Sequence, residues 1–199
     1  MSFVGGVGYS NIDLIYSGLD RLPDKGEEIF ARGFSMQFGG GIPATMINLS
    51  RLGVESRIIT FAGHDLFSEF VKKTLNSYPV KTVNLYKGNK MPVVLSSTLL
   101  YCGDRSFISY TDGMDLNDAV MDEVYENLKG AYVVDMHVGF LDVYKRLKKD
   151  GCIQIFDTGW EDDLTLEKYR DYLEIADYYI PNQKEAIKIT GTSSVEAAA

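Results

Sequence analysis

Short apolar strands alternate with amphipathic helices along most of this chain of 199 residues. The expected strands lie at 2–7, 56–61, 131–136, 152–157 and 177–180, and the expected helices at 44–52, 66–75, 117–128, 141–149, 166–175 and 183–190. Strands and helices that alternate through short connections predict an α/β fold, with a mostly parallel sheet and helices on both of its faces. Because binding groups in such folds gather at the carboxyl ends of the strands, polar residues that follow strands are the first candidates for a site.

The middle of the chain interrupts this alternation. Residues 92–101 and 105–111 are rich in β-forming residues, and Cys102-Gly103-Asp104 joins them as a hairpin turn would. Nearer the N-terminus, turn signals dominate residues 14–33, and a strand is expected at 28–36. The two central runs predict an antiparallel pair that lies outside the parallel sheet.

A run of three glycines, Gly39-Gly40-Gly41, leads through Ile42 and Pro43 into the first predicted helix. Glycine allows backbone dihedrals closed to other residues and lets a ligand approach the main chain, and proline suits the first turn of a helix. Such a loop presents backbone N–H groups and the positive end of the helix dipole to a polar or anionic ligand. A tight strand-to-helix connection explains the stretch equally well.

Asn11 and Asp13 form a second polar feature, shortly after the first predicted strand. Their spacing places both side chains on one side of an extended segment, where an amide and a carboxylate can hold adjacent hydroxyl groups of a polyol. An Asx-turn is the alternative for each residue alone. A dinucleotide site at Gly6-Val7-Gly8 is disfavoured, because the third glycine and the helix of that fingerprint do not follow.

Composition limits the partners. The net charge of -8 argues against nucleic acid, which favours a basic protein surface. The two cysteines, Cys102 and Cys152, lack the spacing of a zinc site. No apolar run is long enough to span a bilayer, and no basic-then-apolar leader opens the chain, so we expect a cytoplasmic protein without a membrane partner.

These motifs together resemble those of the ribokinase-like, or PfkB, carbohydrate kinases, in the same order along the chain. The matching segments are Asn11-Ile12-Asp13, Gly40-Gly41-Ile42-Pro43-Ala44-Thr45, Gly63-His64-Asp65-Leu66-Phe67, Asp157-Thr158-Gly159-Trp160 and Asn182-Gln183-Lys184-Glu185. The resemblance implies ATP-dependent phosphorylation of a sugar hydroxyl. It implies that Asn11, Asp13, Gly40, Gly41 and Thr45 bind the sugar, and that Asn182 and Glu185 act indirectly on magnesium and phosphate.

The resemblance also implies a domain division. Residues 1–13, 37–90 and 112–199 are expected to form the α/β kinase domain, and residues 14–36 and 91–111 a small β-sheet lid over the sugar. An exposed lid sheet has open edges and an apolar face, which a homodimer through the lid would cover.

The sequence departs from the family pattern at three points. Thr45 replaces the asparagine of the glycine loop, and Ser68 replaces a usual glycine. The Gly-Ala-Gly-Asp motif that carries the family's catalytic base does not occur in these 199 residues, so we expect the base beyond residue 199 and no turnover by this chain alone.

Two alternatives stay open. A nucleoside kinase of the same family would need aromatic groups near the lid, which Tyr101, Phe107 and Tyr110 could supply. A non-catalytic sugar-binding module is favoured if the protein ends at residue 199.

Overall fold

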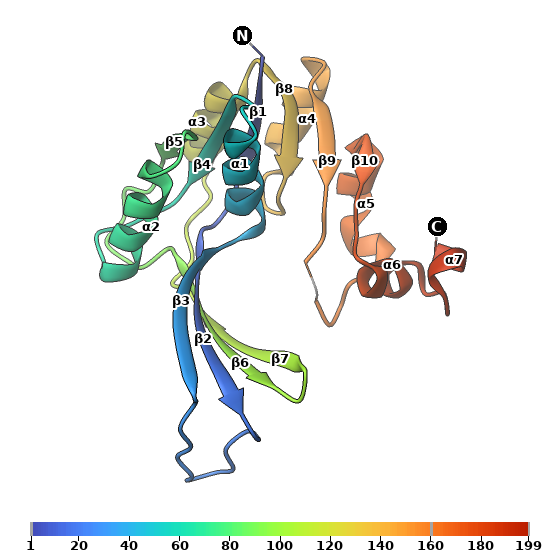
Figure 1. Cartoon of the computed structure of the whole chain (residues 1–199). Coiled ribbons are helices and arrows are strands. Elements are labelled where there is room, and N and C mark those ends of the chain that lie inside the picture. The colour runs from blue at the N-terminus through green and yellow to red at the C-terminus, as the bar shows by residue number, and fades with distance from the viewer. Residues whose placement is uncertain (1, 160, 199) are drawn as a thin grey trace.

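The computed structural model describes residues 2–159 and 161–198 and contains two β-sheets (Figure 1). The strands of the larger sheet point toward the smaller sheet, which lies beyond their carboxyl ends. Trp160, part of one of the family-like motifs, lies outside the described residues. The two sheets are hydrogen-bonded separately, so the chain builds the α/β body and the β element as distinct structures.

The large sheet confirms the predicted parallel arrangement. Its strands follow the order β10-β9-β8-β1-β4-β5, and every pair is parallel. They span Phe3–Val7 (β1), Ser56–Thr60 (β4), Lys81–Asn84 (β5), Ala131–Met136 (β8), Ile153–Phe156 (β9) and Tyr178–Tyr179 (β10). The chain adds strands on one side of β1 and later on the other, so the strand order reverses at β1. A crevice for ligands is expected at the carboxyl ends of the strands at such a reversal.

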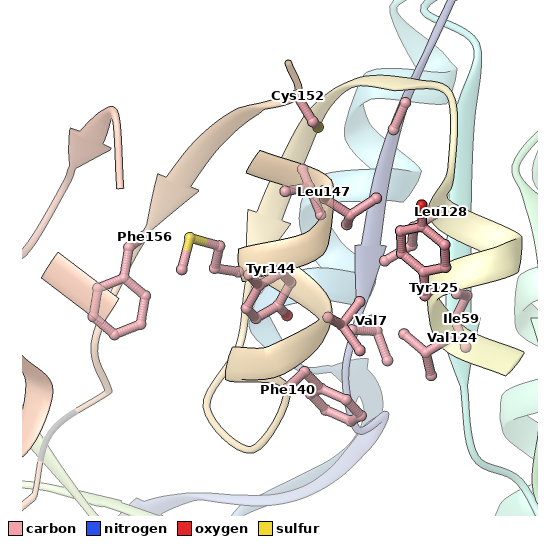
Figure 2. Close-up of a cluster of buried hydrophobic side chains, with 14 of the residues drawn as sticks. Val7, Ile59, Val124, Tyr125, Leu128, Phe140, Tyr144, Leu147, Cys152 and Phe156 are labelled. Atoms are coloured by element: carbon pink, nitrogen blue, oxygen red, sulfur yellow. The ribbon is translucent and has the colours of Figure 1, made fainter. Parts of the chain in front are cut away.

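Helices cover both faces of this sheet. They span Gly41–Arg51 (α1), Leu66–Asn76 (α2), Asp118–Leu128 (α3), Leu141–Lys149 (α4), Leu166–Ile175 (α5), Gln183–Thr190 (α6) and Val195–Ala198 (α7). Neighbouring residues of β4 show the two faces: Ile58 packs with α1 and α2, and Ile59 with α3 and α4. Figure 2 shows the second cluster, in which Leu128 of α3 and Tyr144 of α4 lie against the sheet. Among residues 2–159 and 161–198, no helix combines the length and apolar character needed to cross a membrane.

The small sheet has the order β3-β2-β6-β7. Its strands span Asn11–Leu19 (β2), Gly33–Gly39 (β3), Val94–Tyr101 (β6) and Asp104–Tyr110 (β7). The β6–β7 hairpin confirms the predicted antiparallel pair, whereas β2 and β6 are parallel. Because β2 begins at Asn11 and β3 ends at Gly39, the sheet extends beyond the segment 14–36 at both ends.

The sequence analysis missed part of the small sheet. Residues 14–19, expected as turns, belong to β2, and residues 28–32, expected as strand, do not belong to β3. The reason is tertiary: Ile12 and Leu14 pack into the cluster with α1 and α2, and hydrogen bonds to β3 and β6 hold the strand on both sides. Pairing with distant segments outweighs the local turn signals.

Candidate functional site

Asn11 and Asp13 lie side by side with the glycine stretch. Both occupy the same face of β2, because they are two residues apart in a strand. Asn11 pairs with Gly39 across the sheet, and the Asp13 carboxylate lies so close to Gly39 that a Cβ there would come within 2.6 Å of Oδ2. The fold therefore brings together two features that stand far apart in the sequence.

The glycine stretch ends as the N-terminus of α1. Gly40 is the N-cap with φ of 104°, and a side chain there would meet the Tyr9 carbonyl oxygen at 2.8 Å, so glycine is required on two grounds. The helix begins at Gly41, before the predicted start at residue 44, because Pro43 fits within its first turn. The N–H groups of Gly41 and Ile42 have no partner within the helix. They follow directly on Gly39, which pairs with Asn11 and lies against the Asp13 carboxylate.

Thr45 lies in the first turn of α1 and contacts a residue that the sequence analysis did not select, Asp135. The Thr45 hydroxyl donates to the Gly41 carbonyl oxygen at 3.1 Å, and Asp135 lies near enough for Thr45 to act on the pKa of its carboxyl group. Burial raises the pKa of Asp135 to about 6, although the hydrogen bond from Thr45 acts to lower it. The sequence signal that could have identified Asp135 was a carboxylate near the end of an otherwise apolar strand.

Asp157 follows β9 at the same end of the sheet. Desolvation by its surroundings and the negative charge of Glu185 raise the pKa of Asp157 to about 6, while its side chain keeps contact with solvent. The Asp157 charge in turn acts to raise the pKa of Asp135. The carboxyl ends of β8 and β9 are therefore acidic, which suits cations or hydroxyl donors better than bare anions.

Asn182 and Glu185, predicted to act indirectly on magnesium and phosphate, form a capping box at the start of α6. Asn182 Oδ1 accepts from the Glu185 backbone N–H at 3.0 Å, and Glu185 Oε2 accepts from the Asn182 backbone N–H at 2.9 Å. Glu185 Oε1 takes no part in this box. Within the described part of the chain, no group of three or more His, Cys, Asp and Glu side chains is arranged to hold a metal ion.

Ser68, at the position where the family usually has glycine, links the preceding loop to α2 by hydrogen bonds. The side chain is fully buried; its Oγ accepts from the Gly63 N–H at 2.8 Å and donates to Asp65 Oδ2 at 2.6 Å. Although burial acts to raise it, the pKa of Asp65 stays below its ordinary value because Ser68 and backbone N–H groups donate to the carboxylate. Asp65 is also the N-cap of α2, as predicted.

A separate cavity of about 730 Å³ lies between the β5–β6 connection and α3. Lys87, Lys90 and Asp112 are among its lining residues, and none of the predicted site residues lines it. The candidate site is therefore not part of this cavity. It is the group formed by Asn11, Asp13, the start of α1, and Asp135.

Known proteins resemble the chain along its whole length. The sequence pattern of the pfkB family of carbohydrate kinases matches residues 1–199. A protein of Pyrococcus horikoshii described as a sugar kinase is 35% identical over 92 residues, which cover 44% of this chain and 30% of that protein.

Solved structures show the same fold. The ribokinase of Arabidopsis thaliana, solved with ribose and ATP, superposes with a TM-score of 0.79 and 22% identity, covering 100% of this chain and 67% of that one. The ribokinase of Giardia lamblia gives a TM-score of 0.80 and 19% identity, covering 97% and 61%. The chain thus spans about two thirds of these ribokinases and has their fold. With the family pattern matched over residues 1–199, the chain belongs to the pfkB family of carbohydrate kinases.

Proposed function

We propose that the protein is an ATP-dependent kinase that phosphorylates a hydroxyl group of a sugar. The observation that carries the proposal is the contact between Asp13 and Gly39, which places an amide, a carboxylate and the open N-terminus of α1 around one point. Asn11 and Asp13 would hold adjacent hydroxyl groups, and the N–H groups of Gly41 and Ile42 would donate to oxygen atoms of the ligand. Because the chain spans about two thirds of the ribokinases that it matches, phosphoryl transfer is proposed for the whole protein.

The residues of this chain would act mainly by positioning. A hydroxyl held between Asp13 and the start of α1 cannot rotate away from the phosphoryl donor, which lowers the entropic part of the barrier. The small sheet, as a lid, would keep water from competing with the sugar for the phosphoryl group. ATP supplies the phosphoryl group, and the positive end of α1 favours the negative charge that gathers there during transfer.

Magnesium is proposed as the second cofactor. The capping box occupies Asn182 Oδ1 and Glu185 Oε2, so these two residues fit an indirect role, through water, better than direct ligation. Asp157, whose pKa the Glu185 charge raises, lies in the same acidic region. A bound divalent ion would relieve the repulsion among these carboxylates.

The nucleoside alternative finds less support in the small sheet. In the register of β6 and β7, Phe107 lies on the same face as Asp13, whereas Tyr101 and Tyr110 lie on the opposite face. Of these three rings, only Phe107 is thus on the face where a base beside Asn11 and Asp13 would stack. A sugar remains a better fit than a nucleoside to the amide and carboxylate pair.

Titration calorimetry with ribose, fructose and adenosine, followed by a coupled assay of ADP release, tests the proposal. We expect saturable binding of a sugar and its loss in Asp13→Ala. Tighter binding of adenosine would favour the nucleoside kinase. Sugar binding without ADP release by the whole protein would favour the non-catalytic module, and no sugar binding at all would refute the proposal.

We also propose that the protein is a homodimer through the small sheet. The face opposite Asp13 leaves several apolar side chains exposed: Phe34 (62%), Met36 (40%), Ile108 (71%) and Tyr110 (58%). Covering them would remove an apolar patch and the open edges of the sheet from water. Light scattering should give twice the monomer mass, and Ile108→Asp should give the monomer mass. A monomer in the unaltered protein contradicts the dimer.

A further inference from the structure

One face of the small sheet carries polar and charged side chains on three neighbouring strands. Asp13 of β2 pairs with Ser96 of β6, which pairs with Ser109 of β7, and Thr98 pairs with Phe107 one step along. Paired residues share a face and alternate residues repeat it, so Arg105 lies there as well. We call this surface the clamp face and define it by six residues: Asp13, Ser96, Thr98, Arg105, Phe107 and Ser109.

The clamp face is not the surface that packs against the α/β body. That contact uses the opposite face of the sheet, where Ile12, Leu14 and Leu95 join the cluster formed with α1 and α2. The polar residues of the clamp face therefore need another reason to gather on one side of a small sheet. A ligand that is polar over much of its length provides one.

Hydroxyl groups fill the centre of the clamp face. Ser96 Oγ and Ser109 Oγ form a cross-strand hydrogen bond of 2.8 Å. Thr98 is only 4% exposed, and its Oγ1 is buried without a hydrogen-bond partner in residues 2–159 and 161–198. A buried hydroxyl without a partner costs roughly 1–3 kcal/mol. Ser109 therefore presents an exposed hydroxyl on the clamp face, whereas the Thr98 hydroxyl is enclosed.

Arg105 supplies a positive charge at the far end of the same face. Its guanidinium lies over the Phe107 ring, 5.4 Å from the centroid, and forms no ion pair with a carboxylate of the described residues. Burial raises the pKa of Asp13, and the charge of Arg105 acts to lower it. Arg105 is thus exposed and lies over an aromatic ring, and among the described residues no carboxylate forms an ion pair with it.

We propose that the clamp face is a subsite for a sugar with a negatively charged substituent, a carboxylate or a phosphate, which Arg105 binds. The planar guanidinium matches both groups with paired hydrogen bonds. The inference rests on the proposed function, because Asp13 must hold the hydroxyl end of the same ligand. It adds the substrate class: an acidic sugar rather than a neutral one.

The register sets where the acidic group lies. Ser109 lies at the same level of the sheet as Asp13, and Arg105 is four residues from Ser109. The backbone of Arg105 is therefore roughly 13 Å from the level of Asp13, measured along the strand. The position of the guanidinium over Phe107 brings the charge back by about half of that distance. The substituent therefore belongs at the end of the sugar remote from the hydroxyls at Asp13, where the positive charge of Arg105 offsets repulsion by the Asp13 carboxylate.

Titration calorimetry on matched ligand pairs tests the subsite without requiring catalysis. Glucose 6-phosphate against glucose probes phosphate, and gluconate against sorbitol probes carboxylate. We expect the acidic member of one pair to bind at least about tenfold more tightly, with the preference weakening as salt rises. The pair that shows the preference identifies the acidic group.

Variants locate the effect. Arg105→Gln should abolish the preference and leave binding of the neutral sugar intact, and Arg105→Lys should retain part of the preference. Arg32→Gln is the matched control, since it removes the same charge from the same part of the chain, where Arg32 pairs with Asp20. Equal binding of acidic and neutral sugars, or a preference that survives Arg105→Gln, overturns the inference and leaves the proposed function standing. Absence of binding by all four ligands counts against both.

Discussion

The carboxylate of Asp13 lies across the backbone of Gly39, close enough that any side chain at residue 39 would displace it. β2 and β3 are antiparallel neighbours, and their register places Asn11 opposite Gly39 and Asp13 opposite Gln37. Gly39, the last residue of β3, therefore leaves space for the Asp13 carboxylate. Gly40 and Gly41, which follow it, are the N-cap and the first residue of α1. Glycine is needed at residue 39 to leave room for the Asp13 side chain, not to form a turn.

Gly39→Ala should weaken sugar binding by about tenfold or more, because a Cβ within 2.6 Å of Oδ2 must rotate the Asp13 carboxylate out of place. The backbone at Gly39 is not left-handed, so stability should change by less than about 1 kcal/mol. Calorimetry and urea unfolding measure the two effects. Met36→Ala, on the opposite face of the same strand, is the control, and unchanged affinity in Gly39→Ala contradicts the assigned role of Asp13.

Ser68→Ala should destabilise the protein by about 1–3 kcal/mol, because it leaves the buried Gly63 N–H without its acceptor and removes a donor to Asp65. Ser77→Ala removes an exposed hydroxyl at the other end of α2 and should cost less than about 0.5 kcal/mol. Urea unfolding compares them. Equal losses in the two variants would show that the Ser68 hydrogen bonds contribute nothing specific.

Local sequence patterns predicted the α/β body more successfully than the small sheet. Helices α4, α5 and α6 begin and end at the predicted residues, because each has an amphipathic face and clear terminal signals, such as Asn182 and Gly191 for α6. β2 was missed because its residues pair with segments distant in the chain and contain the turn-like pair Ser17-Gly18. Strand pairing of this kind leaves little trace in a local window.

Asp135→Asn should stabilise the protein at neutral pH and have little effect in acid. The folded-state pKa of Asp135 is about 6, above the ordinary value of 3.8, so the folded protein binds the proton more tightly than the unfolded chain. That contribution to stability is fully present below about pH 3.8 and is lost as the pH rises through about 6.

The advantage of the variant should therefore grow between pH 4 and pH 7.5, to no more than about 3 kcal/mol. Urea unfolding of both proteins at the two pH values measures this difference. A difference that stays constant with pH, or shrinks as the pH rises, is incompatible with a buried, destabilising carboxylate at residue 135.

Glu185→Gln separates the two roles of the capping box residue. The amide keeps an oxygen that can accept from the Asn182 N–H, so the free energy of unfolding should stay within about 0.5 kcal/mol, whereas Glu185→Ala should lose about 1 kcal/mol. Loss of the charge should raise the Mg²⁺ concentration needed for nucleotide binding by the whole protein. An unchanged Mg²⁺ requirement would leave Glu185 with its structural role alone.

Sequence motifs identified one part of the candidate site and missed another. Asn11, Asp13 and the glycine stretch were found because they form motifs, and the fold places them together. Asp135 and Arg105 were not selected, because each is a single charged residue in a strand. Their relation to Thr45 and Asp13 arises only when β8 lies beside β1 and β7 beside β6.

The most direct test of the central claim is calorimetric titration of sugars into the wild-type protein and into Asp13→Ala. The account predicts saturable binding of one sugar to the wild type and a loss of at least about a hundredfold in the variant, with the fold intact by circular dichroism. Equal affinity of the two proteins for that sugar would contradict it, because the sugar would then bind somewhere other than beside Asn11, Asp13 and the start of α1.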